Sequence, residues 1–444
     1  MKKQLLFFLL CSSITCGSVS LMAQTFDSLN LSTSQLFDLS LEELLQIPIN
    51  KSSRQLKLYG YINTNAEKQF GFPRIDGEGK TSRENDPFAW TPVKAFHLYG
   101  SAYLSDNIDV LFNLAYADEK IEVRNAWGNF KLNRFLQARV GKMYRRFGLY
   151  NERLDQIPTF VGIEPPEIFD NDHLFVTRTT NFMLHGNADI SNGNFQYSLT
   201  TENGEGGEAL GIVPLGWDFR FKSDQRSFIV GTSGFTSSLN GRRTTSSTSF
   251  GDGPPKGGIL PWMDGDHFLL TGLFVEKQMG RFHVQAEYWN AKHDALRNPD
   301  HVLTIVREAG INATQRKNFL GASSDKPDQS LVVGDVLVPV KYNVQTYYIR
   351  LSYNIESKIG QFVPYMFIDW MRHPEAISKK GFGGDKESGL ADDGVFTKPS
   401  LGVVYRPIPS VAIKLDGSMH FQRFNGLPER YPEVRLDFSW AFKN

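Results

Sequence analysis

The sequence predicts an all-β chain that closes into an antiparallel, 16-stranded transmembrane β-barrel. Three observations predict this class: an amino-terminal export signal, sixteen segments in which apolar and polar residues alternate, and connections of two very different lengths. A chain of 444 residues with 41% hydrophobic and 22% charged residues is not a disordered one. Basic and acidic residues balance at 48 each, which argues against a nucleic-acid binder because such a protein needs a basic surface.

Residues 1–23 have the three parts of a secretory signal peptide. Two lysines and an apolar run occupy residues 2–10, small residues follow, and the expected cleavage site comes after Ala23. The alternative is a membrane anchor, but the apolar run is too short to cross about 30 Å of hydrocarbon. Both cysteines, Cys11 and Cys16, lie in this segment, so the mature chain has no disulfide and carries 46 basic against 48 acidic residues.

Residues 24–55 lack the alternation and form a separate amino-terminal segment. Ser40-Leu41-Glu42-Glu43 is a capping-box pattern that opens a short helix, and Pro48 ends it. We expect this helix to lie on the periplasmic side of the barrel.

Residues 56–444 carry the barrel, and the alternation is clearest in the last strand. Val434, Leu436 and Phe438 alternate with Arg435 and Asp437, so one face of the strand is apolar and the other charged. The sixteen expected strands span 56–70, 95–105, 108–119, 121–133, 135–148, 181–190, 194–203, 216–223, 227–237, 267–278, 281–292, 344–356, 361–372, 397–406, 411–422 and 432–443.

The connections between these strands are mostly sorted by length. Tight turns such as Ser105-Asp106-Asn107 and Met279-Gly280-Arg281 alternate with long loops, of which 149–180 has 32 residues and 293–343 has 51. Short periplasmic turns and long external loops are typical of outer-membrane barrels with an even number of strands. A soluble β-sandwich shows the same alternation but gives no reason for this segregation. Aromatic residues near strand ends, such as Phe282, Tyr288 and Tyr347, fit interfacial girdles.

The inward faces of such a barrel are predicted to be charged. Sixteen strands leave an interior too wide for wall side chains to fill, so we expect an aqueous channel. Charges on the lipid face are costly, which directs them inward. The basic residues that alternation places on the pore wall are Lys131, Arg139, Arg220, Lys222, Arg350, Lys414 and Arg435. In the fourth strand the facing is ambiguous, since Lys131 and Arg124 cannot both point inward by strict alternation.

The loop 149–180 is the best candidate for a functional element. It is stiffened by prolines and rich in acids, and we expect it to fold into the pore as the constriction. Opposed fixed charges at a narrowing select solutes by charge and size. The acidic residues expected to line the constriction are Asp155, Glu164, Glu167, Asp170 and Asp172.

The chain resembles bacterial outer-membrane porins of the 16-stranded class. The segments Asn125-Ala126-Trp127-Gly128-Asn129-Phe130, Arg139-Val140-Gly141-Lys142 and Arg146-Phe147-Gly148-Leu149 resemble the phosphate-selective porin family, although Arg146 stands where that family has a proline. The resemblance implies the barrel architecture over most of residues 56–444. It does not imply phosphate selectivity, because the constriction loop here is acidic.

The predicted function is therefore passive diffusion of small hydrophilic solutes or ions through a porin in the cell outer membrane. The expected partners are outer-membrane lipids, the diffusing solutes and the barrel-assembly machinery, with a possible homotrimer and no nucleic acid. No cofactor is expected. No metal site is expected either, because neither Asp170-Asn171-Asp172-His173 nor Asp264-Gly265-Asp266-His267 completes a calcium-loop pattern.

Two other functions remain as alternatives. A surface receptor or adhesin would use the long loop 293–343 as its binding element. A barrel-embedded hydrolase would need a triad, for which His185 with Asp189 or His420 with Asp416 are the candidates. Residues four apart on a strand lie about 13 Å apart, too far for a hydrogen bond, and the sequence has no Gly-x-Ser-x-Gly motif. We therefore expect no enzymatic activity.

Overall fold

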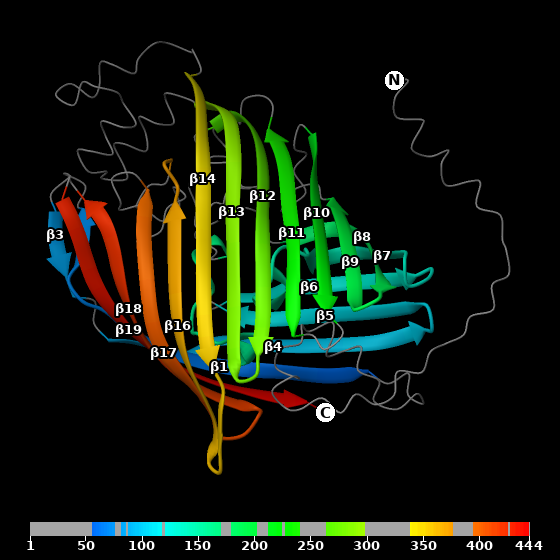
Figure 1. Ribbon diagram of the computed structural model, residues 1–444, viewed down its shortest axis with the longest axis horizontal. Coiled ribbons are helices and arrows are strands. Elements are labelled where there is room, and N and C mark those ends of the chain that lie inside the picture. Colours follow the sequence, from blue (N-terminus) through cyan, green and yellow to red (C-terminus); the bar gives the residue numbers. More distant parts are fainter. Residues whose placement is uncertain are drawn as a thin grey trace. The chain divides into compact units, whose positions relative to one another are not determined.

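The computed structural model describes residues 56–75, 81–85, 88–117, 120–169, 179–201, 212–223, 227–239, 263–297, 338–375, 394–424 and 427–443. Sixteen long strands among them form one sheet (Figure 1). They are β1 (Lys57–Gln69), β4 (Ala89–Ser105), β5 (Ile108–Ala117), β6 (Lys120–Lys131), β7 (Gln137–Tyr144), β8 (Thr179–Ile190), β9 (Gly193–Thr201), β10 (Ile212–Ser223), β11 (Phe228–Leu239), β12 (Met263–Met279), β13 (Phe282–Arg297), β14 (Val338–Tyr353), β16 (Gly360–Arg372), β17 (Val395–Arg406), β18 (Val411–Phe424) and β19 (Leu427–Lys443).

The sheet is closed by its first and last strands. β1 pairs antiparallel with β19 from Tyr59↔Lys443 to Gln69↔Glu433, and its other edge pairs with β4. The short strand β15 (Ile355–Ser357) continues β14 along the same partner, β16. Each of the sixteen predicted strands is present, so the predicted antiparallel 16-stranded β-barrel is confirmed. Closure leaves no free edge along the body of the sheet, which replaces the stabilisation that disulfides would give.

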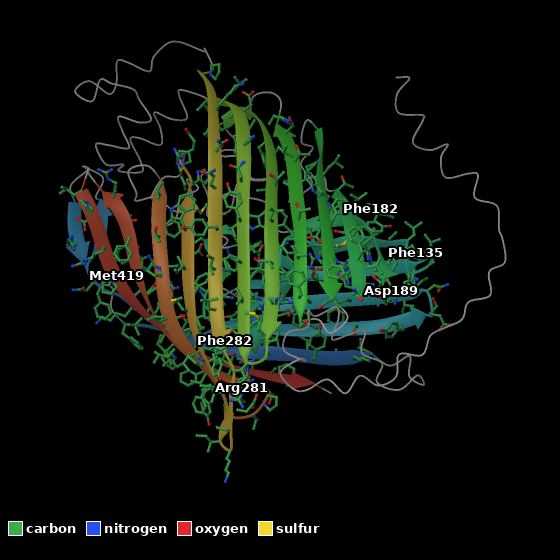
Figure 2. The ribbon with its side chains drawn as sticks, viewed as in Figure 1. Phe135, Phe182, Asp189, Arg281, Phe282 and Met419 are labelled. Atoms are coloured by element: carbon green, nitrogen blue, oxygen red, sulfur yellow. The ribbon has the colours of Figure 1, made fainter. Side chains whose placement is uncertain are left out.

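The two faces of the barrel differ as the alternation predicts. On β19, Glu433, Arg435 and Asp437 are buried and face the interior, while Val434 and Trp440 are 44% and 40% exposed on the outside. Large apolar side chains are exposed around the outer surface from β5 to β19. Figure 2 shows the side chains along both faces of the sheet, with Arg281 and Phe282 at the turn end of β13. An apolar outer face with polar groups inside is what a barrel in lipid requires.

A β-bulge explains the ambiguous facing of β6. The pairing with β5 passes from Asn113↔Asn125 directly to Leu114↔Val123, so Arg124 is the additional residue. A bulge changes the phase of the alternation. Asn125 and Asn129 can therefore face inward although Arg124 precedes them, and both are buried.

The predicted aromatic girdle agrees with the structure at most positions. Phe282 and Tyr288 are 57% and 45% exposed on the outer face of β13, and Tyr347 stacks on Trp370 with ring centroids 5.2 Å apart. Tyr144, an aromatic residue at the end of β7 where the chain turns into the barrel, is instead only 7% exposed.

Several features were absent from the sequence prediction. A hairpin of β2 (Phe72–Ile75) and β3 (Thr81–Glu84) stands between β1 and β4. Three short 3-10 helices follow β7: η2 (Asn151–Arg153), η3 (Ile157–Thr159) and η4 (Glu167–Phe169). The described helices are all too short and polar to cross a membrane. The signal peptide, the amino-terminal helix, Asp170 and Asp172 lie outside the described residues.

The barrel interior contains an apolar core as well as charges. Phe235, Phe268, Phe274 and Trp289 point inward from β11 to β13 and are at most 2% exposed. Their apolar partners come from the segment that follows β7.

Candidate functional site

The segment of residues 145–169, which we call the inner segment, leaves the end of β7 and runs across the interior of the barrel. It contains η2, η3 and η4 joined by extended links. Pro158 in η3 fixes the backbone angle of a short helical turn. Gly148 has φ +61, a left-handed conformation that glycine adopts at little cost and that turns the chain toward the wall.

Aromatic packing holds the first half of the inner segment. The ring of Phe147 stacks on Trp289 with centroids 4.1 Å apart, and Tyr150 packs on Phe160 at 4.8 Å and on Phe169 at 5.8 Å. Stacked pairs of this kind stabilise by about 0.5–1.5 kcal/mol beyond the area that they bury. Burial raises the pKa of the Tyr150 hydroxyl above its usual value, so this ring stays neutral.

Hydrogen bonds to the barrel wall hold the same half. The backbone N–H of Gly148 donates to Ser233 Oγ at 3.0 Å, and that of Leu149 donates to Glu287 Oε1 at 3.1 Å. Arg220 Nη2 donates to the Gly148 carbonyl at 3.2 Å, and its Nη1 lies 3.2 Å from Glu152 Oε2. These contacts attach the segment to β10, β11 and β13.

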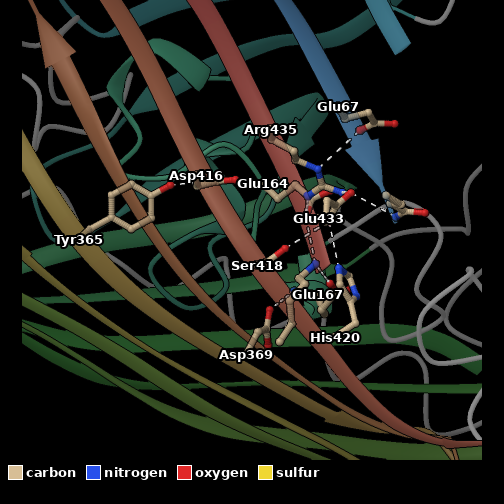
Figure 3. A network of polar contacts seen from close by, with 12 residues as sticks. Glu67, Glu164, Glu167, Tyr365, Asp369, Asp416, Ser418, His420, Glu433 and Arg435 are labelled. Atoms are coloured by element: carbon tan, nitrogen blue, oxygen red, sulfur yellow. Dashed lines mark hydrogen bonds and ion pairs between the residues drawn. The ribbon is translucent and has the colours of Figure 1, made fainter. Parts of the chain in front are cut away.

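Two acids hold the second half, and Figure 3 shows them. Glu164 and Glu167 both bind the Lys398 ammonium group of β17, with Glu164 Oε2 at 2.9 Å from Nζ. Glu164 also pairs with Arg435 of β19, and the Glu167 N–H donates to Asp369 Oδ2 at 2.7 Å. The Lys398 and Glu167 side chains are only 4% and 3% exposed, so this pair is largely removed from water.

The wall around Arg435 is itself a network. Glu433 Oε1 lies 2.8 Å from Arg435 Nη2, and Glu433 Oε2 accepts from Ser418 at 3.3 Å and lies 3.0 Å from His420 Nε2 (Figure 3). Glu67 of β1 reaches Arg435 Nε at 3.5 Å from the other side. Arg435, which pairs with Glu164 of the inner segment, is thus held in place by carboxylates of β1 and β19.

Three further cations of the wall face the middle of the segment. Lys414 donates to the carbonyl oxygens of Ile157 and Gly162, the latter at 3.0 Å. Arg406 donates to the carbonyls of Pro158 and Thr159, both at 3.3 Å. The guanidinium of Arg350 lies 4.6 Å from the Phe367 ring centroid and 5.4 Å from that of Tyr150. These cations bind main-chain carbonyls and aromatic faces of the segment.

The opposite wall also contacts the inner segment. Tyr99 of β4 donates to the Asp155 carbonyl at 2.8 Å, and Asn113 of β5 donates to Asp155 Oδ2 at 3.1 Å. Since β5 and β13 are eight strands apart in the closed ring of sixteen, the segment contacts opposite walls of the interior.

The predicted site residues that the structure describes lie either in the inner segment or on the barrel wall. Asp155, Glu164 and Glu167 lie in the inner segment and contact the wall. Lys131 is 29% exposed and pairs with Asp109 at 2.7 Å, and Lys222 is half-buried. The remaining basic residues are buried on inward-facing strand positions: Arg139, Arg220, Arg350, Lys414 and Arg435. Arg139 lies over the Trp127 ring at 3.9 Å rather than beside the inner segment. Whether these residues line an open channel stays a prediction.

Sequence reasoning missed Lys398 and the apolar inner wall. Lys398 lies between Thr397 and Pro399, in a stretch without clear alternation of apolar and charged residues. The signal for the apolar wall was the mostly apolar stretch 268–275, which only Thr271 and Gly272 interrupt, because a strand with two apolar faces is covered on both sides. Its inward members, such as Phe268 and Phe274, meet the inner segment's cluster.

The residue pairs considered for a hydrolase are not brought together. His185 Nε2 lies 2.8 Å from Asn129 Oδ1, while Asp189 pairs with Arg134. Asp416 accepts from Tyr365 at 2.7 Å, and its partner in the hydrolase hypothesis, His420, binds Glu433. In the described part of the chain no group of three or more potential metal ligands occurs.

The protein is a closed antiparallel barrel with an apolar outer face, and it has short turns at one end and long connections at the other. These features define a transmembrane β-barrel of the outer-membrane type. Two solved structures share this fold. The outer membrane channel DcaP of Acinetobacter baumannii and an anion-selective porin from Comamonas acidovorans each superpose with a TM-score of 0.51 at 10% identity, over 87% of this chain and 97% and 99% of theirs. No family model and no curated protein sequence matches the chain. The similarity is therefore one of fold.

Proposed function

We propose that the protein is an outer-membrane porin, a channel for passive diffusion of small hydrophilic solutes or ions, with the loop 149–180 as its constriction. The observation that carries this proposal is the inner segment, whose acids Glu164 and Glu167 meet wall cations inside a 16-stranded barrel. Its fold is shared with two channel proteins. The short turns face the periplasm and the long loops face outward, in the usual orientation of such barrels.

The geometry indicates a narrow channel. The inner segment binds β4 and β5 on one wall, β13 on the opposite wall and β19 between them, so it reduces the cross-section that water can occupy. The partly exposed Glu164 stands on this segment beside the wall cations Lys398 and Arg435, and Asp155 lies 3.9 Å from the His97 ring. Fixed charges of both signs at a narrowing sort solutes by charge, dipole and size.

Single-channel recording of the full chain in a planar bilayer tests the proposal. We expect discrete conductance steps that are smaller than those of the same barrel with residues 149–169 deleted. No conductance at any voltage in either protein would reject the porin and favour the receptor or adhesin. The possible homotrimer is a separate question, which the mass of the detergent-solubilised protein answers.

Neutralising acids of the inner segment should change the ion preference. We expect the double variant Asp155→Asn/Glu164→Gln to shift the reversal potential in a KCl gradient toward that of chloride, because two negative charges leave the constriction. Asp106→Asn/Glu356→Gln makes the same charge change in exposed turns at the other end and should leave the reversal potential near that of the unmodified protein. Equal reversal potentials in all three proteins would show that the inner segment does not select ions.

A further inference from the structure

Strand β14 is longer than its neighbour β16 at the long-loop end of the barrel. Their last pair is Gln345↔Arg372, yet β14 begins at Val338. Over residues 338–344, β14 pairs with β13 on one edge, as in Lys341↔Asp294 and Asn343↔Lys292. No strand in the described part of the chain pairs with its other edge there. The result is a notch in the barrel wall, with backbone hydrogen-bonding groups of β14 directed into it.

A pocket of about 680 Å³ occupies this notch. Its outer lining comes from β12, β13, β14 and the end of β16, and consists of His267, Leu269, Lys292, Lys341, Asn343 and Arg372. These side chains are all exposed and alternate with buried, inward-facing residues such as Phe268 and Tyr342. The buried residues His293, Tyr342 and Glu375 complete the lining, so the pocket lies in the rim of the wall and has its basic side chains on the outer face.

Two of the three basic side chains that line the pocket have no acidic partner among the described residues, and the lining also contains the acids Asp294 and Glu375. Lys292 and Arg372 take part in no ion pair or hydrogen bond with the residues that the structure describes. Lys341 lies 3.0 Å from Asp294, but the two side chains are 78% and 59% exposed, and such surface pairs are weak. Three basic side chains on adjacent strands are thus available to one anion.

The pocket lies just beyond the outer aromatic row. Tyr288, Tyr347 and Trp370 form this row on β13, β14 and β16, and Gln345 donates to the Tyr288 hydroxyl at 3.3 Å. Below the row the outer face is apolar, with Ile349 43% exposed. Arg372 is two residues past Trp370, about 7 Å along the strand. Aromatic rows mark the membrane interface, so the cations stand at the level of lipid head groups.

We propose that this notch binds the phosphate-bearing head group of a membrane lipid, with the acyl chains lying along the apolar face below the aromatic row. The assignment to the outer leaflet rests on the orientation given in the proposed function. Basic pockets at the membrane surface hold anionic head groups, and each Lys or Arg contributes about 1 kcal/mol there. Backbone donors on the open edge of β14 add hydrogen bonds to phosphate oxygens.

Other occupants fit the notch less well. An extended peptide could pair with the open edge of β14, but it would not by itself supply an anion to Lys292 and Arg372. A second copy of the chain would bring a surface of the same charge to a basic patch. A phosphorylated lipid satisfies the cations and the apolar strip at the same time.

Binding to a bis-phosphorylated lipid A tests the proposal with the full chain in detergent, followed by native mass spectrometry. We expect the triple variant Lys292→Gln/Lys341→Gln/Arg372→Gln to bind lipid A roughly 100-fold more weakly, since each cation contributes about a factor of five. The matched control is Lys277→Gln/Arg281→Gln/Lys358→Gln, exposed residues at the short-turn end, and we expect it to bind within about threefold of the unmodified protein.

Three results would overturn the proposal. Equal binding of lipid A by the two triple variants would show that the notch is not the site. Saturation by inorganic pyrophosphate in competition with lipid A, with no contribution from the acyl chains, would identify a site for free phosphate. Loss of oligomers in the notch variant alone, without a change in lipid binding, would identify an interface between copies. Conductance measured on the same preparations separates a failed lipid site from a failed channel, because the notch lies outside the inner segment.

Discussion

Replacing Lys398 by Met should release the second half of the inner segment and enlarge the channel. Lys398 is the shared partner of Glu164 and Glu167, and the Lys398–Glu167 pair is almost completely buried. Removing one member of a buried ion pair costs about 3–5 kcal/mol because the other charge stays out of water. The segment can avoid this cost by moving Glu167 into the water-filled interior. We therefore expect a higher single-channel conductance and a lower unfolding midpoint in urea.

The control for this variant is Arg134→Met. Arg134 pairs with Asp189 near a turn, and these side chains are 52% and 59% exposed, so we expect a change of less than about 1 kcal/mol and an unaltered conductance. If the Lys398 variant does not fold, Glu167→Gln keeps the shape of the side chain and should still raise the conductance. Conductance and stability equal to those of the unmodified protein in both variants would show that Lys398 does not hold the segment.

Gly148→Ala should displace the first half of the inner segment. A Cβ at Gly148 would lie 2.0 Å from Glu287 Oε2 and 2.7 Å from the Trp289 ring, both part of the buried wall. The backbone there has φ +61, which costs a non-glycine residue about 1–2 kcal/mol. Overpacking adds about 1–3 kcal/mol, and moving the segment away from Trp289 relieves it. We expect a lower unfolding midpoint together with noisier current from a less firmly held constriction.

Gly280→Ala separates the two effects. Gly280 has the same φ of +61 in the turn after β12, but a Cβ there meets nothing within 4 Å. This variant should show the backbone cost alone and quiet current. If the two variants are destabilised equally and both conduct as the unmodified protein does, close packing at Gly148 does not position the inner segment.

The strand pattern of this protein could be predicted from its sequence because lipid imposes a strict rule on each residue. In β18 and β19 the side chains at alternate positions must face either hydrocarbon or the interior, so alternation assigned Lys414 and Arg435 to inward faces, and both side chains are buried. The rule acts on neighbouring residues, which is why alternation and turn residues reveal strand number, order and facing. It was ambiguous at Arg124, where the bulge inserts one residue, and it did not predict the apolar inner wall that includes Phe268 and Phe274.

The candidate site was only partly predictable, since its contacts join residues that are distant in the chain. The acidic character of loop 149–180 indicated Glu164 and Glu167, but their partner Lys398 lies more than 200 residues away in a segment with no distinctive pattern. Nothing in the local sequence of Phe147 indicated that it would stack on Trp289.

The sequence by itself therefore determined the number and facing of the strands and which loop is rich in acids. Only the tertiary structure decided which wall residues bind that loop and that Phe268 and Trp289 pack against it. It also showed that β14 extends beyond the end of β16 and leaves a basic notch in the wall. The physical reason is that solvent acts on each residue separately through burial, whereas packing and ion pairing depend on which strands closure of the barrel brings face to face.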